Sequence, residues 1–166
     1  MSTDTLIKVL FELDGSDWHG HGTETLWASP VPNSEWRHFQ LHNSPFFTRG
    51  INYLDVVAAR PTENETLFEF TEVKTRGGHS TYMILMQPSD PRNAAYWQLL
   101  EQLGCTYERT HIGLSIGRRL LYSVDVPPTA DVYDVYDILE KGHHDGVWIF
   151  QTGHSSIPEP ISYDDE

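Results

Sequence analysis

Apolar and polar residues alternate in short runs through the first half of the chain, a pattern typical of β-strands. Turn-forming residues separate these runs, notably Asp14-Gly15, the prolines Pro30 and Pro32, and the segment 61–64. Five short strands at this spacing predict a small barrel or a rolled sheet. The predicted strands cover residues 7–13, 24–29, 36–41, 52–59 and 66–73.

The hydrophobic period changes after Arg76-Gly77-Gly78. Two segments then carry apolar residues at i, i+3, i+4 and i+7, which predicts two helices. These residues are Tyr96, Leu99, Leu100 and Leu103 in the first helix, and Val132, Val135, Tyr136 and Leu139 in the second. Strands are predicted at residues 80–86, 105–111, 118–126 and 147–151. The order β-α-β-β-α-β is that of the ferredoxin-like, split βαβ motif.

Capping residues are expected at both ends of each helix. Asp90 is predicted to be the first N-cap, with Pro91 at the first helical position and Gly104 as the stop signal. For the second helix, Thr129 is the predicted cap and Gly142 the predicted end.

These patterns predict an α+β protein with two halves. Residues 1–78 are expected to form a β-rich, barrel-like half, and residues 79–152 a ferredoxin-like half. Residues 153–166 hold two prolines and end in Asp164-Asp165-Glu166, so we expect an acidic, flexible tail.

Charge is the strongest signal in the composition of the 166 residues. Eleven Lys and Arg stand against 24 Asp and Glu, which gives a formal net charge of −13 and a pI near 4.9. Such a surface repels phosphate backbones and attracts basic proteins, so a basic protein partner is expected and direct nucleic-acid binding is not. The alternative is that the charge serves only solubility.

Membrane insertion and secretion are not expected. No apolar run reaches the roughly 20 residues that span a bilayer, and the first residues lack the pattern of a secretory signal. One cysteine, Cys105, allows no internal disulfide, so a cytoplasmic location is expected.

Catalytic and metal-binding motifs are not evident. The nine histidines include no HExxH, and His38 and His42 fall in a predicted strand, where such residues lie about 13 Å apart. The chain has no GxSxG, GxGxxG or GxxxxGK[ST] motif, and Cys105 fits a small buried core residue. The expectation is a protein without enzyme activity, metal or cofactor.

The junction between the halves is the first candidate binding region. Arg76, His79 and Ser80 flank a Gly-Gly pair whose N–H groups could form a small anion nest. The alternative is a hinge between domains with polar caps.

Phe46 and Phe47 follow a proline between polar stretches. They are expected to fill the barrel end or the seam between the halves. Alternatively they anchor a partner, since aromatic residues dominate binding hot spots.

A third candidate region lies on the second predicted helix. Asp131, Asp134, Asp137 and Glu140 fall opposite its apolar face at successive i, i+3 spacing. They form either a solvated face or an anionic stripe that contacts Lys and Arg of a partner.

Several segments together resemble the DUF4265 family over roughly residues 6–151. They are TLWA at 25–28, NSPFFTRG at 43–50, YLDVV at 53–57, GHST at 78–81 and VPP at 126–128. Leu54 stands where the family pattern has glycine before Asp55. The resemblance implies a bacterial origin and a shared fold, and it brings no catalytic residues because the family's function is unknown.

The expected function is that of an acidic protein-binding module. Small acidic bacterial proteins of this type resemble immunity proteins, which neutralise a cognate toxin, here one with a basic nucleic-acid-binding cleft. The alternatives are a small-ligand-binding regulator or enzyme that uses the cleft between the halves, and an adaptor whose charge has no specific role.

Overall fold

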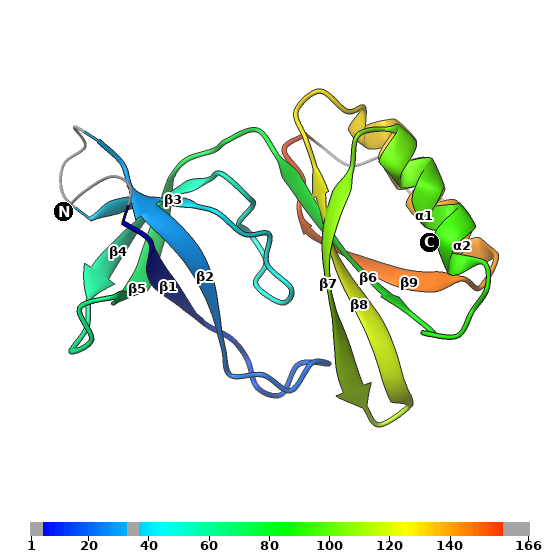
Figure 1. Cartoon of the computed structure of the whole chain (residues 1–166), viewed down its shortest axis with the longest axis horizontal. Coiled ribbons are helices and arrows are strands. Elements are labelled where there is room, and N and C mark those ends of the chain that lie inside the picture. The colour runs from blue at the N-terminus through cyan, green and yellow to red at the C-terminus, as the bar shows by residue number, and fades with distance from the viewer. Residues whose placement is uncertain (1–4, 33–36, 158–166) are drawn as a thin grey trace, which may run out of the picture.

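The computed structural model describes residues 5–32 and 37–157. The first half is a closed five-stranded barrel in the order β1-β2-β3-β4-β5 (Figure 1). Its strands are β1 (Ile7–Glu12), β2 (Thr23–Pro30), β3 (His38–Leu41), β4 (Val56–Pro61) and β5 (Leu67–Thr75). Neighbouring strands pair antiparallel, except that β1 and β5 pair in parallel and close the barrel. Alternate residues of the strands fill its interior, as in Ile7, Val9 and Phe11 of β1.

The second half is a four-stranded antiparallel sheet with two helices packed on one face (Figure 1). The strand order is β7-β8-β6-β9. The elements are β6 (Ser80–Met86), α1 (Asn93–Gln102), β7 (Thr106–Leu114), β8 (Gly117–Val126), α2 (Val132–His144) and β9 (Trp148–His154). The predicted α+β class, with a barrel followed by a sheet and two helices, is confirmed.

The sheet of the second half has apolar side chains on both faces. One face packs against the helices through a cluster that includes Tyr82, Ile84, Leu100 and Leu139. The other face carries Met83, Leu85, Ile112 and Leu121, and packs against Trp18, Phe46, Phe47 and Leu114. Every residue of the central strand β6 is therefore buried. Trp18, Phe46 and Phe47 come from loops of the barrel, so this second cluster joins the two halves.

Two predicted helix caps are wrong. Asp90 accepts hydrogen bonds from the Arg92 backbone and guanidinium in a turn before the helix, so α1 begins at Asn93 and its N-cap is Arg92. Thr129 lies inside a turn closed by the bond from Ala130 N–H to Pro127 O, 3.0 Å long. The N-cap of α2 is instead Asp131, whose carboxylate accepts from the backbone N–H groups of residues 133 and 134.

Several predicted strand ends also differ, including those of β4, β7 and β9. Residues 52–55 form a turn and not the start of β4, because Leu54 has a positive φ of 68° that breaks the extended chain. Gly153 and His154 belong to β9 and not to the tail. Of the predicted acidic tail, residues 158–166 lie outside the described residues, as does the predicted start of the third strand at Trp36.

Gly142 does not end α2, which continues to His144. The indole of Trp148 packs directly on Gly142, and its Nε1–H donates to Leu139 O at 3.0 Å. A Cβ on residue 142 would overlap the indole ring. This glycine is therefore required by the close approach of β9 to α2 and not by helix termination.

We expect Gly142→Ala to lower the free energy of unfolding by about 1–3 kcal/mol through overpacking against Trp148. Helix propensity alone predicts the opposite, a gain of about 1 kcal/mol. Urea denaturation followed by circular dichroism measures the change. Gly113→Ala is the matched control, because a Cβ there meets no atom within 4 Å. Equal stability of the two variants would contradict the packing argument.

Candidate functional site

The junction between the halves is organised by Asp55, whose side chain is fully buried. Its carboxylate accepts from Asn52 N–H at 2.9 Å, from the Asn52 amide at 3.3 Å, and from Gly77 N–H at 2.9 Å. The Arg76 guanidinium also donates to it, at 2.9 Å. A buried carboxylate is tolerated when ion pairing and hydrogen bonds replace its hydration in this way.

Asn52 extends this network from the barrel into the second sheet. Its Oδ1 accepts from the Thr81 hydroxyl at 2.7 Å, so its Nδ2 is the donor toward His154 Nδ1, 2.8 Å away. His154 Nδ1 is therefore an acceptor and carries no proton. Burial lowers the pKa of His154 below its ordinary value, and the charge of Arg76 lowers it further.

The three predicted ligand-binding residues at this junction are occupied by contacts within the protein. Arg76 binds Asp55 and also donates to Gly50 O at 2.7 Å. His79 pairs with Asp125 at 2.8 Å, and Ser80 exchanges hydrogen bonds with Ser156. These contacts agree with the polar caps of the second alternative, and they belong to a network that holds the junction in one arrangement.

A second site lies at the seam, where the segment 44–48 meets the second sheet. Glu24 holds this segment: its carboxylate accepts from the backbone N–H groups of Phe46, Phe47 and Thr48 and from the Thr48 hydroxyl, at 2.7–3.2 Å. Both phenylalanines are half-buried and pack at the seam. Their position favours the packing alternative over an exposed partner anchor.

The β1–β2 loop reaches across to the second sheet beside this segment (Figure 1). His19 is buried and its ring lies 4.7 Å from that of Phe47, while the ring of His21 stacks on Phe47 at 4.5 Å. Burial lowers the pKa of His19, an effect that Asp17 opposes. These aromatic contacts fix the loop against the 44–48 segment.

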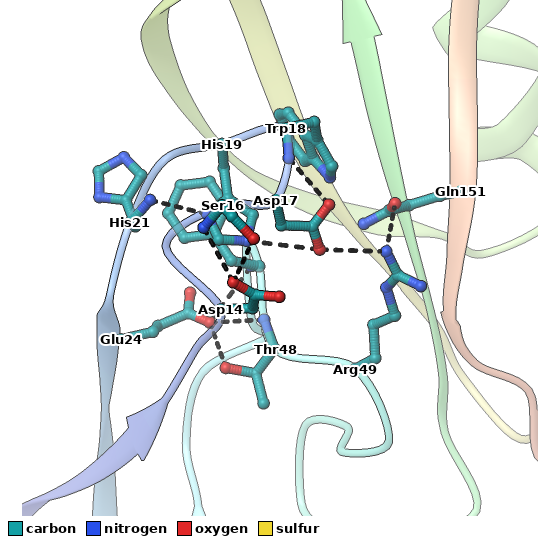
Figure 2. Close-up of polar contacts among 11 residues, drawn as sticks. Asp14, Ser16, Asp17, Trp18, His19, His21, Glu24, Thr48, Arg49 and Gln151 are labelled. Carbon is teal, nitrogen blue, oxygen red and sulfur yellow. Dashed lines mark hydrogen bonds and ion pairs between the residues drawn. The ribbon is translucent and has the colours of Figure 1, made fainter.

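Arg49 links the loop to β9. Its guanidinium lies 3.4 Å from Asp17 in the loop and donates to Gln151 Oε1 of β9, also at 3.4 Å (Figure 2). The three residues thus connect the barrel to the edge strand of the second sheet.

Next to this link is an apolar pocket of about 370 Å³. Two polar groups in its lining, Trp18 Nε1 and Gln151 Nε2, are buried and have no hydrogen-bond partner among the described residues. Each unpaired donor costs about 1–3 kcal/mol. The full lining is Trp18, Met83, Leu85, Leu114, Ser115, Ile116, Leu121, Ile149, Phe150 and Gln151.

The acidic residues of α2 lie on the outer side of the helix layer. Asp131, Asp134 and Asp137 are exposed and Glu140 is half-buried. The Asp131 carboxylate serves as the N-cap, whereas no ion pair with the other three occurs within residues 5–32 and 37–157. The neighbouring cation Lys141 pairs instead with Asp145, at 3.0 Å.

Three side chains could in principle act as nucleophiles: Cys105, Ser29 and Ser80. Burial raises the pKa of Cys105 to about 12, so its thiol is protonated at neutral pH. The Ser29 hydroxyl and His42 Nε2 are 2.6 Å apart, but among the described residues no carboxylate accepts a hydrogen bond from His42. His79 pairs with Asp125, yet the adjacent Ser80 hydroxyl bonds to Ser156.

The described part of the chain contains neither a cluster of metal ligands nor a membrane-spanning helix. Within residues 5–32 and 37–157, no three His, Cys, Asp or Glu side chains gather as a metal site would require. No helix there is both long and apolar enough to cross a bilayer.

Sequence reasoning missed five residues that build the junction and the seam: Trp18, Glu24, Arg49, Asp55 and Gln151. A weak signal existed for Asp55, which is an acid directly before the apolar pair Val56-Val57. Contacts such as that of Glu24 with residue 46 join distant positions, and no local pattern marks them.

A barrel followed by an antiparallel sheet with two helices on one face defines the protein as an α+β protein of two connected halves. The family described as Domain of unknown function (DUF4265) matches residues 24–150, and the chain belongs to this family. This confirms the resemblance noted in the sequence.

The fold is similar to that in a crystal structure of a hypothetical protein from Neisseria gonorrhoeae. The TM-score is 0.68 with 16% sequence identity, and the match covers 95% of this chain and 99% of that chain. At this identity the likeness establishes the fold alone. No curated protein matches the sequence.

We expect Asp55→Asn to lower the free energy of unfolding by about 3 kcal/mol, because several donors lose a buried charged acceptor. Urea denaturation measures this loss. The control is Glu69→Gln, which removes the charge from the partly exposed Arg60–Glu69 pair and should cost under about 1 kcal/mol. A similar decrease in the free energy of unfolding in both variants would show that the Asp55 network contributes no more than a surface ion pair.

The His154 network predicts a dependence of stability on pH. The folded-state pKa of His154 is below that of the unfolded chain, so the unfolded state binds more protons between the two values. The contribution of neutral His154 to the free energy of unfolding is therefore fully present above about pH 6.5. It is lost as the pH drops below that value toward the folded-state pKa.

His154→Gln keeps an acceptor for Asn52 and removes the titrating group. We expect urea denaturation between pH 7.5 and 5.5 to show a smaller loss of stability in this variant than in the unchanged protein. Some loss should remain, because His19 also has a lowered pKa. His144→Gln at the exposed end of α2 is the control, and an equal effect there would refute the assignment.

Proposed function

We propose that this protein is an acidic binding module that recognises a basic protein partner, and that it acts in the cytoplasm as an immunity protein against a cognate bacterial toxin. The observation that carries the proposal is the outer face of α2. There Asp134, Asp137 and Glu140 form an acidic face that cations of the described residues leave unpaired.

The cations nearest to this helix are engaged elsewhere. Lys141 pairs with Asp145, and Arg92 binds Asp90 and donates to the backbone carbonyl oxygen of Asp145. Like charges at i, i+3 spacing cost the helix a few tenths of a kcal/mol per pair, so helix stability does not account for the acidic face.

A basic partner would relieve this repulsion and associate faster because of electrostatic steering. Toxins that act on nucleic acids have basic clefts, and an acidic helix placed in such a cleft would block the substrate. The net charge of −13 extends the attraction beyond the contact itself.

The proposal includes two finer assignments. The second half is assigned to the ferredoxin-like folds, based on its β-α-β-β-α-β order, its strand order and its helices on one face. The protein is also proposed to bind without catalysing a reaction. The protonated thiol of Cys105 and the internal pairing of Arg76, His79 and Ser80 support this view.

Co-expression with the product of the neighbouring gene, followed by pull-down, tests for the partner. With a partner in hand, we expect the double variant Asp134→Lys, Asp137→Lys to lower the association rate by about tenfold at low salt. Stopped-flow or surface-plasmon measurements give this rate, and circular dichroism checks the fold.

The matched control is Glu63→Lys, Glu65→Lys. It makes the same change in net charge at two exposed positions between β4 and β5, in the barrel (Figure 1). A lower association rate in the α2 double variant, together with an unchanged rate in the control, supports the proposal. Equal rates in the two variants would place the interface elsewhere, and turnover of a small molecule without protein binding would end the proposal.

A further inference from the structure

We infer that the pocket at the seam binds a small apolar molecule that carries a neutral hydrogen-bond acceptor, such as a carbonyl oxygen. This site is independent of the acidic face of α2. It uses the face of the second sheet that the helices leave uncovered.

The pocket has the size and lining of a ligand site. Its volume of about 370 Å³ exceeds the roughly 150 Å³ of an apolar cavity that binds benzene. Met83, Leu85 and Leu121 form its floor, and Trp18 of the β1–β2 loop covers it from the barrel side. The rim residues Ile116 and Ile149 are 62% and 52% exposed, so a small molecule has access from solvent.

The chemistry of the ligand follows from two buried donors in the lining. Gln151 Oε1 accepts from Arg49, which fixes the orientation of the amide and leaves Nε2 as the free end. Trp18 Nε1–H is likewise buried, with no acceptor in the part of the chain that the structure describes. Figure 2 shows the two side chains extending toward one another between the loop and β9. An acceptor oxygen bound between them would satisfy both donors.

Local charge favours a neutral acceptor over a carboxylate. The Asp17 carboxylate, on the residue before Trp18, lies 3.4 Å from the Arg49 guanidinium and takes up its charge (Figure 2). A second anion would lie near Asp17 in a strongly acidic protein, and the residues that line the pocket include no lysine or arginine. A neutral carbonyl oxygen meets no such repulsion.

The probe for this site is 2-octanone, titrated into the full-length protein and followed by nuclear magnetic resonance. We expect saturable shifts of the Trp18 indole N–H and Gln151 side-chain amide signals. Octanoate, of the same chain length, should bind more weakly. No saturable binding of 2-octanone, or tighter binding of octanoate, would overturn the inference.

Two variants test the donors. Gln151→Glu keeps the oxygen that accepts from Arg49 and removes the free donor, so the Kd of 2-octanone should rise about fivefold, as for one lost hydrogen bond. Trp18→Phe keeps an aromatic cover and should have a similar effect, which guards against misfolding of either variant.

The control is Gln102→Glu, the same exchange on the exposed surface of α1, which should leave the Kd unchanged. Equal affinity of all four proteins for 2-octanone would overturn the inference. Protection of Ile116 and Ile149 by a protein partner, with no binding of 2-octanone, would overturn it too and identify a protein-docking pocket.

Discussion

The arrangement of the two halves depends on the buried carboxylate of Asp55. It is removed from water in a protein interior, where an unpaired charge costs several kcal/mol, so each donor around it must stay in place. The donors come from the turn before β4 and from the segment between the halves. Through Asn52, the same network reaches Thr81 in β6 and His154 in β9. One side chain thereby fixes the exit of the barrel relative to the second sheet.

The seam shows how loops of one half complete the core of the other. The second sheet has an apolar face that the helices do not cover, and an uncovered face of this kind would expose apolar surface to water. Glu24 holds the 44–48 segment over part of it, and the β1–β2 loop covers a neighbouring part. The part of the apolar face that these loops cover ends at Trp18, and the pocket lies next to this residue.

Local patterns in the sequence predict most elements of the fold but not their ends or their long-range contacts. The period of the apolar residues places both helices and the nine strands of the described residues close to their observed positions. Thr129 and Asp131 are both good N-cap residues, and only the turn closed by Ala130 decides between them. The role of Gly142 depends on Trp148, which approaches it from a separate element. The pocket depends on contacts between residues 18, 49 and 151, which only the folded chain brings together.

The complete burial of β6 has a consequence for how the chain is made. This strand is the first element of the second half to leave the ribosome, yet its sheet neighbours are β8 and β9, and β9 is the last strand of the described chain. During synthesis, the apolar segment from Tyr82 to Met86 therefore has no strand partner on either edge until β8 and β9 have been made. Such an unpaired segment favours intermolecular β-pairing. Translation speed and chaperone capture over this interval thus bear directly on the yield of folded protein.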